Sequence, residues 1–268
     1  MPLTETPTAP AATLTVRSLL VWGLLAGLVG GLLAFGFASA FGEPAVERAI
    51  SIEEAGAGHQ HPGETAEQPA AEHSHGEAEE EEVVSRAFQS TGGLGIGAVI
   101  YGLGLGGLFS LAFAFAYGRV GSLTPRATSL AVAGLGYLAV VLVPFLTYPA
   151  NPPAVGNPDT IGERTGLFFG MIAISLALLV TAVAAARALA PKLGGWWSTV
   201  AAGVGYAVIV TLVAKLLPTF QEVPEGFPGD LLWQFRIASL GTSAVLWAGI
   251  GLTFAALLHR GITRSRTA

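Results

Sequence analysis

The sequence predicts an all-α integral membrane protein with six transmembrane helices. Hydrophobic residues make up 52% of the 268-residue chain and charged residues only 12%, whereas soluble domains carry about 25% charged residues. The hydrophobic residues gather in runs long enough to cross a hydrocarbon core of about 30 Å. Between the first two runs, the segment from Glu53 to Glu82 holds ten carboxylates, four of the five histidines and no lysine or arginine. We expect this His- and acid-rich loop to be disordered and extracytoplasmic.

Polar connections separate the apolar runs. The expected segments are a cytoplasmic tail at 1–17, helices at 18–41, 93–117, 127–147, 165–189, 196–217 and 234–258, an extracytoplasmic loop at 42–92, and a cytoplasmic tail at 259–268. Within the loop, we expect a short amphipathic turn at 43–50 and no secondary structure from Glu53 to about Glu79, where the composition cannot support a core.

The first helix carries a glycine at every fourth position. Gly23, Gly27 and Gly31 form overlapping small-xxx-small steps, which let a second backbone come close inside a membrane. This pattern predicts that the helix packs against protein. Ala38-Ser39-Ala40 also resembles a signal-peptidase site, but the apolar core of a signal peptide spans only about 7–15 residues. A retained helix is therefore favoured over a cleaved signal.

The distribution of charges predicts the orientation, because short cytoplasmic loops are enriched in lysine and arginine. Eight of the thirteen positive residues fall on the side that holds both termini, and seventeen of the eighteen carboxylates fall on the other side. We expect both termini in the cytoplasm and the acidic loop outside the plasma membrane.

Several function classes lack support. The chain has no cysteine, so it has neither disulfides nor thiolate metal sites. It has no basic stripe for nucleic acid, no phosphate-binding G-x-x-x-x-G-K-[ST] loop, and no His-Glu-x-x-His or nucleophile with a base. We expect no enzyme, no nucleic-acid partner and no permanently bound cofactor.

Two histidine pairs in the loop are the strongest candidates for metal capture. His59 and His61, like His73 and His75, are alternate residues that face the same side of an extended chain. Imidazole binds Co, Ni, Zn and Cu(II), and the surrounding carboxylates concentrate cations. The competing interpretation is a solvated, low-complexity loop, whose acids favour the protonated imidazole that cannot bind metal.

Carboxylates outside the loop form a second group of candidates. Those assigned to an outer mouth for the ion are Glu43, Glu47, Asp159 and Glu163, with Glu222, Glu225 and Asp230 as further members. The alternative is that they neutralise the basic residues at the membrane interface, which are Arg48, Arg164, Lys215 and Arg236.

Two outer connections resemble each other. Pro144 is followed twenty residues later by Arg164, and Pro218 is followed eighteen residues later by Arg236. This similar spacing indicates that the third and fourth helices are repeated as the fifth and sixth helices. Internal symmetry of this kind is known from transporters. Each arginine stands where a helix re-enters the membrane, and we expect both to brace the outer mouth rather than bind cargo.

The expected helices carry no Asp, Glu or His between their ends, although an ion site at the membrane midplane normally uses such residues. The path of an ion is therefore not visible in the sequence. Hydroxyl groups are present at Ser110, Ser175, Thr181, Thr211, Ser239, Thr242 and Ser243. We expect these groups to bond helix to helix.

Taken together, the chain resembles the CbtA family of predicted cobalt transporter subunits over about residues 17 to 260. The resemblance rests on the glycine-rich first helix that runs into Phe41-Gly42-Glu43-Pro44-Ala45-Val46-Glu47-Arg48-Ala49-Ile50, on the His- and acid-rich loop, and on Tyr148-Pro149-Ala150-Asn151-Pro152-Pro153-Ala154-Val155-Gly156 with the following Arg164. It implies cobalt as the transported ion and a very small, single-span partner protein with its own histidines.

The residues and the resemblance together favour a membrane subunit of a divalent-metal importer whose outer loop captures the ion. The alternative is a membrane receptor or sensor that binds metal without conducting it. The metal is left open by the residues alone, since ligand affinity would favour Cu(II) over Co(II).

Overall fold

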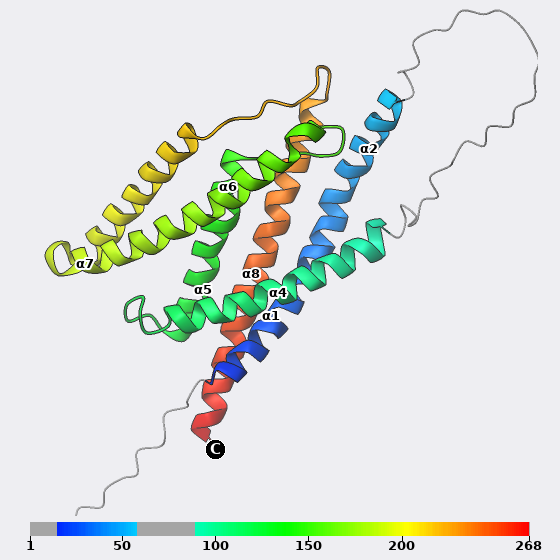
Figure 1. Ribbon diagram of the computed structural model, residues 1–268. Coiled ribbons are helices and arrows are strands. Elements are labelled where there is room, and N and C mark those ends of the chain that lie inside the picture. The colour runs from blue at the N-terminus through cyan, green and yellow to red at the C-terminus, as the bar shows by residue number, and fades with distance from the viewer. Residues whose placement is uncertain (1–14, 58–88, 268) are drawn as a thin grey trace, which may run out of the picture.

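The computed structural model describes residues 15–57 and 89–267, and every regular element in those ranges is helical (Figure 1). This confirms the all-α class. Five segments of the described chain are long and apolar enough to cross a membrane: Val16–Ala55, Ser90–Ala116, Pro125–Thr147, Pro158–Leu216 and Gly229–Thr263. The sequence predicts six, and the difference lies in the fourth segment.

The first segment is longer than expected because its helix continues past Phe41, where the sequence predicts its end. Helix α1 (Val16–Phe37) passes through a π-helical turn, η1 (Ala38–Gly42), into α2 (Glu43–Ala57). The expectation of a short turn at 43–50 and of no secondary structure from Glu53 onward is wrong for residues 53–57, because α2 continues to Ala57. Pro44 does not break the helix, because the wider turn directly before it shifts the backbone register; the N–H of Glu43 donates to Ala38 O, five residues back.

Helices α1 and α4 (Leu94–Ala116) cross at the glycines that the sequence singles out. A methyl group added to Gly106 would lie 2.7 Å from the Cα of Gly27, and one added to Gly102 would lie 2.9 Å from the Cα of Gly31. No side chain fits between backbones at that distance. The prediction that the first helix packs against protein is therefore confirmed.

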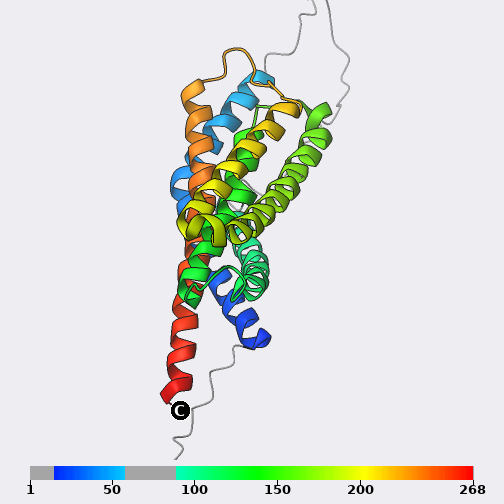
Figure 2. The same cartoon turned by 90° about the vertical axis from the view of Figure 1, so that its left-hand side faces the viewer.

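Helix α8 (Gly229–Thr267) forms the spine of the molecule and runs from one end to the other (Figure 2). It lies antiparallel to α1, since Gly261 is next to Trp22 and Gly241 is next to Phe37. Phe254 packs edge-on against Phe109 and Phe113 of α4, with ring centroids 5.3 and 5.0 Å apart. Leu246, Trp247 and Ile250 of α8 belong to the same buried cluster.

Helix α5 (Pro125–Gly136) packs on the opposite flank of α8, where Ser129 Oγ donates a 2.9 Å hydrogen bond to Gly251 O. A second π-helical turn, η3 (Tyr137–Leu142), then leads into α6 (Val143–Thr147). As at Pro44, this turn ends two residues before a proline, Pro144, and the residue between them, Val143, donates its N–H to Leu138 O.

Helix α7 (Ile161–Leu216) contains the fourth and fifth expected helices in one element that folds back on itself. The backbone leaves helical geometry at Gly194 (φ 77°, ψ 159°), three residues after Pro191. Ser175 and Tyr206 share a buried 2.7 Å hydrogen bond, although a straight helix would separate them by about 1.5 Å per residue. The two arms therefore lie side by side (Figure 1). The number of membrane crossings stays a prediction.

The ends of the helices lie at two opposite ends of the molecule. The start of α1 lies beside the end of α8, through Trp22 and Gly261. At the other end, Ala45 and Ala49 of α2 pack against Leu231 at the start of α8, and Arg48 hydrogen-bonds Gln234. The connections at 148–160 and 217–228 lie at the same end as α2 (Figure 1).

Candidate functional site: two interlocked connections over a cavity

The connection between α6 and α7, residues 148–160, meets the connection between α7 and α8, residues 217–228. The Tyr148 hydroxyl donates a 3.0 Å hydrogen bond to Pro218 O, and its ring lies 6.3 Å from that of Phe220. These are the two connections that resemble each other in sequence.

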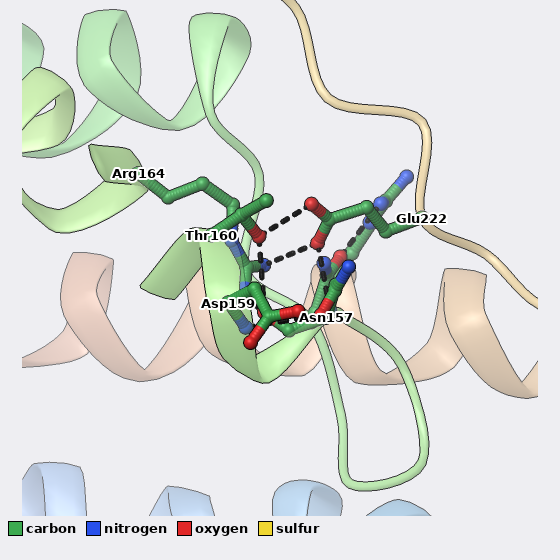
Figure 3. Close-up of polar contacts among 7 residues, drawn as sticks. Asn157, Asp159, Thr160, Arg164 and Glu222 are labelled. Atoms are coloured by element: carbon green, nitrogen blue, oxygen red, sulfur yellow. Dashed lines mark hydrogen bonds and ion pairs between the residues drawn. The ribbon is translucent and has the colours of Figure 1, made fainter. Parts of the chain in front are cut away.

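Glu222 ties the second connection to the first (Figure 3). Its carboxylate accepts hydrogen bonds from the Asn157 N–H at 3.0 Å and from the Thr160 hydroxyl at 2.5 Å. Arg164 Nη1 lies 3.3 Å from Glu222 Oε2. The short 3₁₀ turn η4 (Pro158–Thr160) places these donors together, and Asn157 Oδ1 caps it by accepting from the Asp159 N–H. One carboxylate thus holds two donors of the other connection and the arginine that follows it.

These contacts lower the pKa of Glu222. The largest cause is the Thr160 hydroxyl, followed by the Asn157 N–H; the Arg164 charge acts in the same direction, while desolvation opposes them. Hydrogen bonds and a positive charge favour the ionised carboxylate. Conversely, burial and the nearby Glu163 raise the pKa of Tyr148, so its phenol stays protonated as a donor.

Arg236, on α8 after the second connection, reaches back to the first. Its Nε donates to Ala150 O at 3.2 Å and its Nη2 donates to Asn151 Oδ1 at 3.0 Å. Arg164 follows the first connection and binds the second, and Arg236 follows the second and binds the first. This reciprocal exchange agrees with the bracing role expected for both arginines.

Gly156 makes room for the Arg164 guanidinium. Its φ is +128°, a conformation that side-chain-bearing residues rarely adopt, and an added Cβ would lie 3.0 Å from Arg164 Nη2 and 3.2 Å from Nη1. Glycine is therefore required at this position both for its positive φ and because a side chain would collide with the guanidinium.

A cavity of about 750 Å³ lies beneath the two connections. Its walls come from α4, η3, α6, α7 and α8 as well as the connections. Aromatic walls are formed by Tyr101, Phe145, Tyr148, Phe168, Phe169 and Phe220, and polar groups by Asn151, Arg164, Thr165, Thr219, Glu222, Arg236, Ser239 and Ser243.

The charges on this cavity do not suit a bare metal cation. Arg164 and Glu222 neutralise each other, and Arg236 forms no ion pair with any carboxylate of residues 15–57 and 89–267. A divalent cation about 5 Å from one guanidinium would be repelled by roughly 7 kcal/mol at an effective dielectric constant of about 20. The Glu222 carboxylate is also already occupied by three donors.

The sequence-predicted ligands fall into three places. His59, His61, His73 and His75 lie outside the described residues. Asp159 and Glu163 are exposed beside the interlocked connections, and Glu47 is exposed on α2, with Glu43 one turn earlier and half-buried. In the part of the chain that the structure describes, no three His, Asp or Glu side chains gather as a metal site would require. The assignment of these carboxylates to an outer mouth stays a prediction.

Sequence reasoning missed the partners of the two arginines. It groups Glu222 with the outer acids, and the alternative that such acids neutralise interface arginines holds for Glu222 and Arg164. No local pattern identifies Asn151 or Ala150 as the partners of Arg236. Of the hydroxyls expected to join helices, Ser175 bonds across to Tyr206, whereas Ser110, Thr181, Thr211 and Ser239 donate to their own helices.

Residues 16–259 match the family model described as "Probable cobalt transporter subunit (CbtA)". No curated protein matches the chain, and no solved structure matches it. The match spans α1 through nearly all of α8 and includes the interlocked connections and the cavity. The chain therefore belongs to the CbtA family, the family that this description names.

Proposed function

We propose that this protein is the membrane subunit of an importer for divalent transition metal ions, with cobalt as its cargo, and that the outer His- and acid-rich loop captures the ion. The observation that carries the proposal is the family match over residues 16–259, which includes every apolar segment of the described chain. The residues supply the capture chemistry, since His59, His61, His73 and His75 provide neutral imidazoles for Co(II).

The course of α2 supports this role for the loop. Helix α2 continues α1 and packs beside the start of α8, at the end of the molecule that holds the two connections. The chain therefore enters the histidine-rich segment, directly after Ala57, from the same end as the connections (Figure 1). Metal bound there would be released next to Asp159 and Glu163, the proposed mouth.

A partner protein would complete the path. The middle parts of the apolar segments carry no Asp, Glu or His, and the charged side chains nearest the cavity are paired or positive. The family description itself speaks of one subunit of a transporter. We propose that a small single-span protein with its own histidines supplies the missing ligands, and that the folded-back α7 contributes two of six crossings.

Uptake of radioactive cobalt by cells provides the test. Cells that express this chain with the small partner should accumulate cobalt, and cells that express either one alone should not. If the full pair bound cobalt at the cell surface without raising the internal content, the protein would be a metal receptor or sensor instead of an importer.

The orientation is tested in the same cells. The chain has no cysteine, so single cysteines can be placed at Ser74 and Ser265 without background. Ser74→Cys should react with an impermeant reagent from outside, and Ser265→Cys only after permeabilisation. The reverse pattern would place the loop in the cytoplasm and rule out capture of external metal.

A further inference from the structure

The cavity beneath the two connections has one positive charge without a protein counter-charge. The Arg236 guanidinium has five N–H donors; one goes to Ala150 O and one to Asn151 Oδ1, at 3.2 and 3.0 Å. Within the described residues the remaining three have no acceptor, and no carboxylate pairs with this arginine. The guanidinium is half-buried and lines the cavity.

Other lining groups are also available to a ligand. The hydroxyls of Thr165, Thr219 and Ser243 line the same cavity and make no hydrogen bond to any part of the chain that the structure describes. The aromatic rings of Tyr101, Phe145 and Phe168 line this cavity as well. A site with one fixed cation, a few hydroxyls and aromatic walls has the composition of a small-molecule pocket rather than of an ion channel.

We propose that this cavity binds an organic anion, with its carboxylate or phosphate on Arg236 and an apolar body against the aromatic rings. An arginine fork matches both oxyanions, and a partly desolvated guanidinium gains more from such a partner than one in water. The volume agrees, because pockets for small molecules measure about 300–1,000 Å³ and this cavity measures about 750 Å³. This site is additional to the proposed metal capture and does not depend on it.

The anion can come from solution or from the headgroup of an anionic lipid, and calorimetry on the purified full-length chain separates the two. In a neutral detergent, the chain is titrated with phthalate, with its uncharged dimethyl ester, and with cobalt chloride. In phosphatidylcholine nanodiscs, the phthalate titration is repeated with and without phosphatidylglycerol. Phthalate should bind and the ester should not. Competition by phosphatidylglycerol would identify a lipid as the natural source, and its absence would identify a soluble anion.

Two variants test whether phthalate binds to Arg236. Arg236→Gln removes the charge, and phthalate should bind at least about tenfold more weakly, the scale set by charge-assisted hydrogen bonds. Asn151→Asp keeps the contact to Arg236 Nη2 but adds a carboxylate, which should occupy the guanidinium and exclude phthalate while leaving the melting temperature unchanged or higher. Because it preserves the brace, this variant decides the matter if Arg236→Gln does not fold.

Arg119→Gln is the matched control, because Arg119 lies outside the cavity and its guanidinium donates to Phe115 O at 3.0 Å on its own helix. It should bind phthalate as the unaltered chain does. Unchanged phthalate binding in both Arg236→Gln and Asn151→Asp would overturn the proposal. Equal binding of the uncharged ester, or cobalt chloride binding that depends on Arg236, would also overturn it.

Discussion

Arg164 and Glu222 form an ion pair, with Nη1 and Oε2 3.3 Å apart, that joins two connections on either side of the folded-back helix α7. Arg236 makes the reciprocal link to Asn151 of the first connection at 3.0 Å. Separating the two connections would therefore break contacts at both arginines.

The ion pair predicts a ranking of substitutions at Arg164. Lysine keeps the charge near Glu222 but loses the second arm of the fork, so Arg164→Lys should lower the melting temperature slightly and Arg164→Ala should lower it more. The double variant Arg164→Ala/Glu222→Gln should lose less than the sum of the two single losses, because both remove one contact. Thermal unfolding of the detergent-purified protein measures all four. Equal damage from lysine and alanine would show that the guanidinium shape, and not its charge, is required.

Glu222 also predicts a pH dependence. Its pKa in the folded protein is lowered, chiefly by the Thr160 hydroxyl, so the ionised form stabilises the fold fully above the unfolded pKa of about 4.3. That contribution is lost as the pH falls through the lower, folded pKa. The difference in melting temperature between the unaltered chain and Glu222→Gln should thus be constant near neutral pH and shrink below about pH 4. A difference that grew on acidification would contradict the assigned direction.

Gly156 should not tolerate a side chain. Gly156→Ala places a methyl against the Arg164 guanidinium at a φ of +128°, and a residue held in such a region costs about 1–3 kcal/mol. Gly162→Ala is the control, since a Cβ there meets nothing within 4 Å. Chemical denaturation should show the loss in the first variant alone. Equal stability of the two would mean that the turn can rearrange around Arg164.

Glycine substitutions on α4 test the close crossing of α1 and α4, and a second glycine on the same helix serves as the control. Gly106→Ala forces a methyl into the Gly27 backbone at 2.7 Å, whereas Gly104→Ala meets nothing within 4 Å. Overpacking of this kind costs about 1–3 kcal/mol. Unfolding in detergent should therefore separate the two variants clearly. If Gly104→Ala were the more damaging, the crossing would lie at a different face of α4.

The histidine pairs should matter most when metal is scarce. Deleting residues 64–77 together with His59→Ala and His61→Ala should raise the cobalt concentration for half-maximal uptake and leave the maximal rate nearly unchanged. Because neutral imidazole binds metal and its reference pKa is about 6.5, uptake at low cobalt should also lose its decline on acidification. Loss of transport at every concentration would instead make the histidines part of the obligatory path. No change at all would leave the loop a solvated acidic segment.

The sequence predicts the helices well where composition alone decides. The segments at 94–116 and 125–147 agree with expectation within a few residues, because long apolar runs bounded by Gly, Thr or Pro leave little choice. The continuation of α1 into α2 was not predictable, because Gly42 and Pro44 normally end a helix. No local sequence pattern indicates the π-helical turn that accommodates the proline.

The candidate site also has parts that the sequence predicts and parts that it does not. The bracing role of Arg164 and Arg236 could be predicted, because each arginine follows one of two similar connections. The partners of the two arginines could not be predicted, because contacts between distant residues leave no periodicity in the sequence. The cavity could not be foreseen for the same reason: its walls are contributed by five separate helical elements and two connections, and only their packing brings Tyr101 and Arg236 into one cavity lining.

The hydrogen bond between Ser175 and Tyr206 has a consequence for how the chain is made. Each hydroxyl lies in a long apolar stretch, and the two satisfy each other across the bend at Gly194. Until the second arm is made, the Ser175 hydroxyl can donate to a carbonyl of its own helix, as the Thr181 and Thr211 hydroxyls do. The link between the arms therefore forms only once Tyr206 has been synthesised and the second arm has folded back at Gly194.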